Sequence, residues 1–185
     1  MPKLTLIGYR GTGKSTLARG LADLLGCDWR DADLVLEERV GRTIAALVRD
    51  RGEAAFRAEE SAVLGELLRD FHGVIATGGG AVLDAGNRQL LKTLGRPVVW
   101  LKAPAAVIRG RLAADPTTRD RRPALAGDDP LAEVEPALLL RDPLYRECAD
   151  VCIDAADAAP EELVAGLAAW LVDWDAGHGS QTRLS

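Results

Sequence analysis

One stretch near the start of the chain, Gly8-Tyr-Arg-Gly-Thr-Gly-Lys-Ser15, constrains the fold more than any other. It matches the phosphate-loop pattern of glycine, four residues, glycine, lysine and then serine or threonine. The apolar segment Leu4–Ile7 before it predicts a buried strand, and the run Thr16–Leu25 after it has the apolar spacing of a helix. A strand, a glycine loop and a helix in this order predict a binding site for a nucleoside triphosphate.

The residues of this loop are expected to bind different parts of the triphosphate. Its glycines let backbone N–H groups approach the phosphates, and the N-terminus of the following helix adds a favourable dipole. Lys14 is expected to reach the outer phosphates and to be catalytic, while the Ser15 hydroxyl is expected to bind Mg²⁺. The predicted nucleotide-binding residues of the loop are Gly11, Thr12, Gly13, Lys14, Ser15 and Thr16.

Four further apolar segments predict strands, and helical segments separate them. These strands are expected within Cys27–Asp31, Val74–Thr77, Val98–Leu101 and Val151–Asp154. Five strands that alternate with helices predict an α/β fold of three layers, in which a five-stranded parallel sheet lies between helices. Ligands of such folds bind at the carboxyl ends of the strands, so the residues that follow each strand are the first candidates for a site.

We expect a single domain over residues 1–175, followed by a disordered tail over residues 176–185. Inside the domain, a block of helices over residues 34–70, with a cap at Thr43 and a break at Gly52, separates two strands. The segment 113–129 is rich in proline and arginine and predicts a mobile, positively charged lid. The core is expected to comprise residues 1–33, 71–112 and 130–175, with a helix over Leu131–Cys148 that is interrupted around Pro143.

Composition and charge argue against several classes of partner. The net charge of −5 over 185 residues is unlike the basic field of a nucleic-acid-binding protein. No apolar run approaches the roughly 18 residues of a membrane helix. Three cysteines, without the second pair that a zinc site needs, favour a reducing compartment. These features favour a cytoplasmic protein without nucleic-acid or membrane partners. We also expect a monomer whose partners are small molecules.

Two carboxylates follow the second predicted strand. Residues two apart in an extended segment point to the same side, so Asp31 and Asp33 are expected to face the phosphate end of the sheet together. Asp31 is the candidate for the metal side, and Asp33 is the candidate to orient or deprotonate an attacking hydroxyl. A solvated turn with an acidic helix start is an equal alternative for this pair.

Three glycines and three arginines complete the set of candidates. Gly78-Gly-Gly80 follows a buried strand and leaves bare backbone that a ligand can approach, although a plain turn is the alternative. The guanidinium groups of Arg57, Arg122 and Arg141 can bind a carboxylate or phosphate at two points. Surface charge is the alternative for each arginine taken alone.

Taken together, these motifs resemble the shikimate kinase family, in the family's order and from Lys3 to about Leu171. The resemblance implies an enzyme that transfers the γ-phosphate of ATP to the 3-hydroxyl of shikimate, with Mg²⁺ as cofactor. Its fold is expected to be that of nucleoside monophosphate kinases, with a substrate-binding block and a lid. The resemblance rests on Gly8–Ser15, Asp31-Ala-Asp33, Phe56-Arg57, Thr77-Gly-Gly-Gly80, Arg122-Pro123 and Arg141-Asp-Pro-Leu-Tyr145.

The resemblance also implies a role for each candidate residue. Lys14 would bind the phosphates, Ser15 and Asp31 the magnesium ion, and Arg111 would stack near adenine. Arg122 would contact the phosphates from the lid and act as a catalytic residue with Lys14 and Asp33. The implied shikimate-binding residues are Asp33, Arg57, Gly79, Gly80 and Arg141. Two features depart from the family pattern, namely Ala124 in the lid and the loop Asp154–Asp157, which lacks basic or amide residues.

Two other functions remain open at this point. Another small-molecule kinase of the same fold, such as a gluconate or nucleoside monophosphate kinase, would share the phosphate loop. A nucleotide-dependent binding module or regulatory GTPase is less favoured. Asn87 is the sole asparagine of the chain and is not followed by the Lys-x-Asp signal that reads guanine.

Overall fold

The computed structural model describes residues 1–115 and 131–178. Most of the predicted lid, including Arg122, lies outside the described residues. The strands are β1 (Leu4–Ile7), β2 (Trp29–Asp31), β3 (Val74–Ala76), β4 (Val98–Lys102) and β5 (Val151–Asp154). The helices are α1 (Lys14–Leu25), α2 (Ala32–Val40), α3 (Ile44–Asp70), the short 3₁₀ helix η1 (Ala81–Leu83), α4 (Ala85–Leu94), α5 (Ala105–Ala114), α7 (Val134–Cys148) and α8 (Pro160–His178). None of the described helices is both long and apolar enough to span a membrane.

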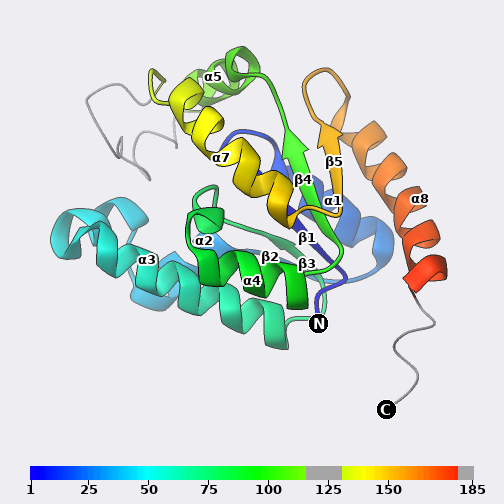
Figure 1. Ribbon diagram of the computed structural model, residues 1–185, viewed down its shortest axis with the longest axis horizontal. Coiled ribbons are helices and arrows are strands. Elements are labelled where there is room, and N and C mark those ends of the chain that lie inside the picture. The colour runs from blue at the N-terminus through cyan, green and yellow to red at the C-terminus, as the bar shows by residue number, and fades with distance from the viewer. Residues whose placement is uncertain (116–130, 179–185) are drawn as a thin grey trace.

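The five strands form one parallel sheet in the order β2-β3-β1-β4-β5. In Figure 1, α4 and α7 lie in front of this sheet and α1 lies behind it. The predicted α/β class and five-stranded parallel sheet are confirmed. Because all strands run the same way, the segments that follow β1, β2 and β3 emerge at the same edge of the sheet, where a ligand can contact all of them.

The core follows from the alternation of side chains along the buried strands. Leu6 of β1 packs with Leu17 of α1 and Leu167 of α8 on one face of the sheet. Its neighbour Ile7 packs on the other face with Leu68 of α3 and with residues of α4 and α7. Successive strand residues point to opposite faces, so each face of β1 needs its own layer of helices.

The helix α3 has a break that the sequence predicts. Thr43 caps its N-terminus by accepting a hydrogen bond from the Ala46 N–H at 3.2 Å. At Gly52 the backbone leaves helical geometry, with a φ of 83° and a ψ of 165°. A positive φ of this size favours glycine over residues that carry a Cβ. The part of α3 after the break carries Phe56 and Arg57, and Arg57 lies beside Gly80 in the turn that follows β3.

Two predictions about the extent of the helices are wrong. The helix α7 runs without interruption through Pro143, whose side chain is exposed. Proline removes one N–H from the helix, and the carbonyl that loses its donor belongs to Leu139, a residue that is 76% exposed and accessible to water. The predicted tail starts too early as well, because α8 continues to His178. Ala176 has a high helix propensity, and the helix continues past the point at which the sequence becomes polar.

Candidate active site

The phosphate loop connects β1 to α1 and depends on its glycines for its shape. Gly8 has a φ of 139°, and a Cβ on it would lie 2.3 Å from the carbonyl oxygen of Leu101 in β4. Gly11 and Gly13 also have positive φ values, of 78° and 95°. A residue with a side chain at Gly8 would therefore push the loop off the sheet edge.

Lys14 is held inside this loop. Its side chain is 8% exposed, and its Nζ donates hydrogen bonds to the carbonyl oxygens of Gly8 at 2.8 Å and Tyr9 at 2.9 Å. Both acceptors are uncharged. A phosphate oxygen would be a stronger acceptor for the same ammonium group, because hydrogen bonds between charged groups are roughly twice as strong as neutral ones.

A cavity of about 440 Å³ opens beside the loop. Five of the six loop residues predicted to bind nucleotide line it, and these are Gly11, Gly13, Lys14, Ser15 and Thr16. Thr12 does not line it, because its hydroxyl donates to the Tyr9 carbonyl at 2.8 Å and its side chain is buried. The volume lies within the usual range of small-ligand sites.

Asp31 joins the cavity to the start of α2. Its Oδ2 accepts a hydrogen bond from the Ser15 hydroxyl at 2.5 Å, while its Oδ1 caps α2 by accepting from the Asp33 N–H at 3.0 Å. Asp33 lies in the first turn of the helix, so the predicted extended geometry of this pair is wrong. Both aspartates still line the cavity, because the helix starts directly at the strand end.

Ser15 and Asp31 are a chemically suitable pair for Mg²⁺. This ion prefers oxygen ligands and binds through one or two protein groups together with water and phosphate oxygens. The described residues contain no cluster of three or more acidic, histidine or cysteine side chains that could hold a metal. A site with few protein ligands is therefore the kind that these two residues fit.

The Gly78–Gly80 turn after β3 is closely surrounded by charged side chains. A Cβ on Gly78 would lie 2.7 Å from both Asp33 Oδ1 and Glu60 Oε1, and a Cβ on Gly80 would lie 2.4 Å from an Nη of Arg57. The sequence predicted open backbone at this turn. The missing side chains of Gly78 and Gly80 make room for carboxylates and a guanidinium group of the site, while Gly79 lines the cavity.

Arg57 lies on α3 between two carboxylates. It donates to Glu60 at 2.7 Å from one end, and to Glu53 at 3.2 Å from the other. Its guanidinium carbon also lies 4.7 Å from the centre of the Phe56 ring. These contacts hold the planar group in one orientation, at the edge of the glycine turn.

Glu60 is a site residue that our sequence analysis missed. It is 5% exposed, and burial raises the pKa of its carboxyl, while the charge of Arg57 acts in the opposite direction. Its position three residues after Arg57 on a helix is the signal that could have found it, because such pairs lie on one helix face.

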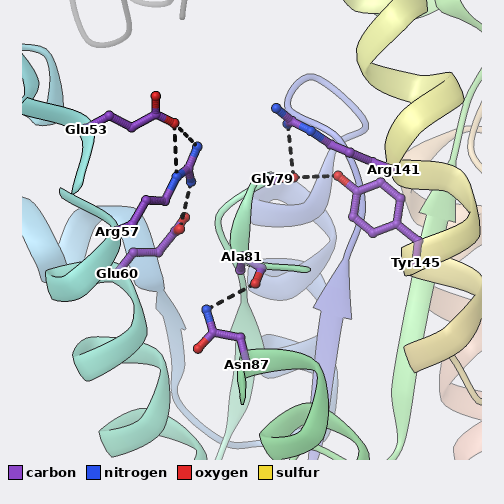
Figure 2. A network of polar contacts seen from close by, with 8 residues as sticks. All are labelled: Glu53, Arg57, Glu60, Gly79, Ala81, Asn87, Arg141 and Tyr145. Atoms are coloured by element: carbon purple, nitrogen blue, oxygen red, sulfur yellow. Dashed lines mark hydrogen bonds and ion pairs between the residues drawn. The ribbon is translucent and has the colours of Figure 1, made fainter. Parts of the chain in front are cut away.

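Arg141 and Tyr145 approach the same turn from α7. Nη1 of Arg141 donates to the Gly79 carbonyl at 3.3 Å, and the Tyr145 hydroxyl donates to that carbonyl at 2.5 Å. Figure 2 shows Arg57 and Arg141 on opposite sides of the turn, each on its own helix. Two guanidinium groups, from residues 84 positions apart (141 − 57), thus flank one short stretch of backbone.

The remaining candidate residues differ in their position relative to the cavity. Arg111 on α5 lines the cavity and donates to the carbonyls of Ala155 at 2.7 Å and Ala156 at 3.3 Å, in the loop after β5. Arg57, Gly80 and Arg141 do not line the cavity itself. They adjoin it through Gly79, which does line it. The lid arginine, Arg122, lies outside the described residues.

Comparison with known proteins places the chain in a family. The family model described as shikimate kinase matches residues 10–172. The shikimate kinase of Rhodopirellula baltica is 42% identical over 161 residues, which cover 87% of this chain and 86% of the relative. That of Halorhodospira halophila is 45% identical over 152 residues, covering 82% and 83%. The structure of shikimate kinase from Acinetobacter baumannii in complex with shikimate matches with a TM-score of 0.84 and 36% identity over 92% of each chain. The chain therefore belongs to the shikimate kinase family.

Proposed function

We propose that this protein transfers the γ-phosphate of ATP to the 3-hydroxyl of shikimate, which gives shikimate 3-phosphate and ADP, a step of aromatic amino acid biosynthesis. One observation carries the proposal: the glycine turn lies directly against the phosphate loop. A Cβ on Gly79 would lie 2.9 Å from the backbone nitrogen of Arg10. A phosphate on the loop and a small acid on the turn would therefore be neighbours, as transfer between them requires.

The donor half of the site is built by the phosphate loop. The backbone N–H groups and the N-terminus of α1 would bind the phosphates of ATP. Lys14 would exchange the carbonyls of Gly8 and Tyr9 for phosphate oxygens and stabilise the charge on the transferring group. Arg111 is suited to border the adenine, since it already fixes the loop after β5.

The acceptor half of the site is built around the glycine turn. Arg57 and Arg141 would bind the carboxylate of shikimate from opposite sides, and the backbone of Gly79 and Gly80 would lie against its ring. Asp33 lines the cavity between this turn and the loop. Its carboxylate would accept the hydrogen bond of the 3-hydroxyl and orient that oxygen toward the γ-phosphate.

Ser15 and Asp31 would hold Mg²⁺ at the donor half. When bound there, the ion neutralises charge on the phosphates of ATP. Asp31 is well placed for this role because capping of α2 fixes its orientation. Further parts of the proposal are a single kinase domain over residues 1–175, a substrate-binding block over residues 34–70, a phosphate contact from Arg122, a monomeric state and a cytoplasmic location.

The proposal is tested by coupled measurement of ADP release with Mg²⁺ and ATP. We expect release that depends on shikimate and is at background level with gluconate or nucleoside monophosphates. ADP release with one of those acceptors, and none with shikimate, would assign the chain to another small-molecule kinase activity. Binding of GTP without turnover of any acceptor would instead favour the binding module.

A further inference from the structure

The Gly79 carbonyl is the point at which α7 meets the acceptor turn. This oxygen is buried and accepts two side-chain hydrogen bonds, from Tyr145 at 2.5 Å and Arg141 at 3.3 Å (Figure 2). The two bonds are unequal. The one from Tyr145 is short and the one from Arg141 lies near the limit of hydrogen bonding. Tyr145 is therefore the main donor to this carbonyl.

The carbonyl belongs to the peptide group that joins Gly79 to Gly80. A trans peptide is planar, so its N–H points in the direction opposite to its C=O. With the carbonyl held toward α7, the Gly80 N–H points away from α7, on the side from which Arg57 approaches Gly80. No hydrogen bond from the Gly79 or Gly80 N–H occurs within residues 1–115 and 131–178.

The surroundings of Tyr145 hold its side chain in place. Its side chain is 0% exposed, and its ring stacks on Trp100 of β4 with centroids 5.8 Å apart. Burial is the main cause that raises the pKa of its phenol, so the hydroxyl keeps its proton and remains a donor. Arg141, by contrast, has a long bond to the carbonyl and a buried Nε that meets no acceptor among the described residues.

We propose that Tyr145 is a positioning residue of the acceptor site, which holds the Gly79 carbonyl so that the Gly80 N–H faces the substrate while Arg141 leaves that carbonyl for the substrate's carboxylate. Without the phenol, a buried carbonyl would lose its remaining donor when Arg141 moves. The peptide would then rotate and turn the Gly80 N–H away from the acid, which weakens binding of the acid. The inference rests on the proposed function of the site.

The test is the Tyr145→Phe variant, which removes the hydroxyl and keeps the ring. Leaving a buried acceptor without its donor is expected to raise the KM for shikimate about tenfold, with the KM for ATP changed less than about twofold. Asn87→Ala is the matched control, because Asn87 donates at 3.1 Å to the carbonyl of Ala81, the first residue of η1 directly after this turn. It should lower the melting temperature at least as much as Tyr145→Phe, yet leave the KM for shikimate within about twofold of wild type.

Two further outcomes decide the inference. In an Arg141→Ala background, Tyr145→Phe should raise the KM at least as much as in wild type, because the carbonyl then has no donor at all. An effect that disappears in this background, or equal KM changes for both substrates, overturns the proposal. Calorimetric titration with shikimate separates the proposed function from the role of Tyr145. Absence of binding by wild type overturns the proposed function itself. Normal binding by Tyr145→Phe overturns only the role of Tyr145.

Discussion

The geometry of the acceptor site gives a specific prediction for the replacement of Arg57 by lysine. The guanidinium group spans two carboxylates, with 2.7 Å to Glu60 and 3.2 Å to Glu53. A lysine keeps the positive charge, but its single ammonium group cannot span both carboxylates and also offer a planar fork to a ligand. Arg57→Lys therefore tests the fork rather than the charge.

The size of the effect follows from the bonds that are lost. A hydrogen bond to a charged group contributes about 1.5–3 kcal/mol, and each 1.4 kcal/mol is about tenfold in affinity. Loss of one such bond to the carboxylate of shikimate should raise its KM about ten- to hundredfold. The KM for ATP should change less than about twofold, because Arg57 does not line the cavity beside the phosphate loop.

The same variant should also change how the free energy of unfolding depends on pH. Burial raises the pKa of Glu60 in the folded protein, so the stabilisation linked to this carboxyl is present below its unfolded pKa and is lost as pH rises through its folded pKa. Arg57 opposes that shift. Lysine keeps the positive charge but lacks the fork that donates to Glu60 at 2.7 Å, so the loss should become larger. The gap in unfolding free energy between wild type and variant should therefore widen as pH rises through that window.

Steady-state kinetics and denaturant unfolding at several pH values check both expectations. Glu53→Gln is the matched control, since Glu53 binds the same guanidinium group but is 51% exposed. Exposed pairs contribute little, so its KM for shikimate should stay within about twofold of wild type. If Arg57→Lys leaves the KM for shikimate unchanged, or raises both KM values equally, the assignment of Arg57 to the acceptor is refuted.

Three further variants test the other parts of the site. Lys14→Ala should lower kcat at least about 10²-fold, because it removes the charge beside the transferring phosphate; near-normal kcat in a steady-state assay would remove Lys14 from that role. Arg141→Ala should raise the KM for shikimate at least about tenfold, with little change for ATP, and equal changes would place Arg141 elsewhere. Asp31→Asn keeps a good helix cap, so a Mg²⁺ titration of activity should shift to about tenfold higher concentration without a fall in melting temperature; an unchanged titration would contradict a metal role for Asp31.

Local sequence patterns were sufficient to predict the phosphate loop and the elements beside it. The phosphate loop, its positive-φ glycines and the strand before it are encoded within a dozen consecutive residues. The break at Gly52 and the cap at Thr43 are local in the same way. Such features depend on backbone conformation and on neighbours in sequence, which a single sequence displays directly.

The acceptor half was harder to predict because its contacts are tertiary. Tyr145 and Gly79 are 66 residues apart, and nothing in the spacing of either residue indicates that a phenol binds that carbonyl. Glu60 is one of many charged residues in the segment 34–70, and only the folded structure shows that it is buried beside Gly78. The extended geometry expected for Asp31 and Asp33 was wrong, because Asp31 uses its carboxylate to start a helix.

The most direct test of the account is identification of the product by ³¹P NMR after incubation with shikimate, ATP and Mg²⁺. We predict one new phosphate monoester on the 3-oxygen of shikimate, formed in equal amount to ADP and at least about 10²-fold more slowly when Lys14→Ala replaces wild type. Inorganic phosphate as the sole new phosphorus species, or a phosphate ester at another oxygen, would contradict the arrangement in which Asp33 directs the 3-hydroxyl toward the phosphate on the loop.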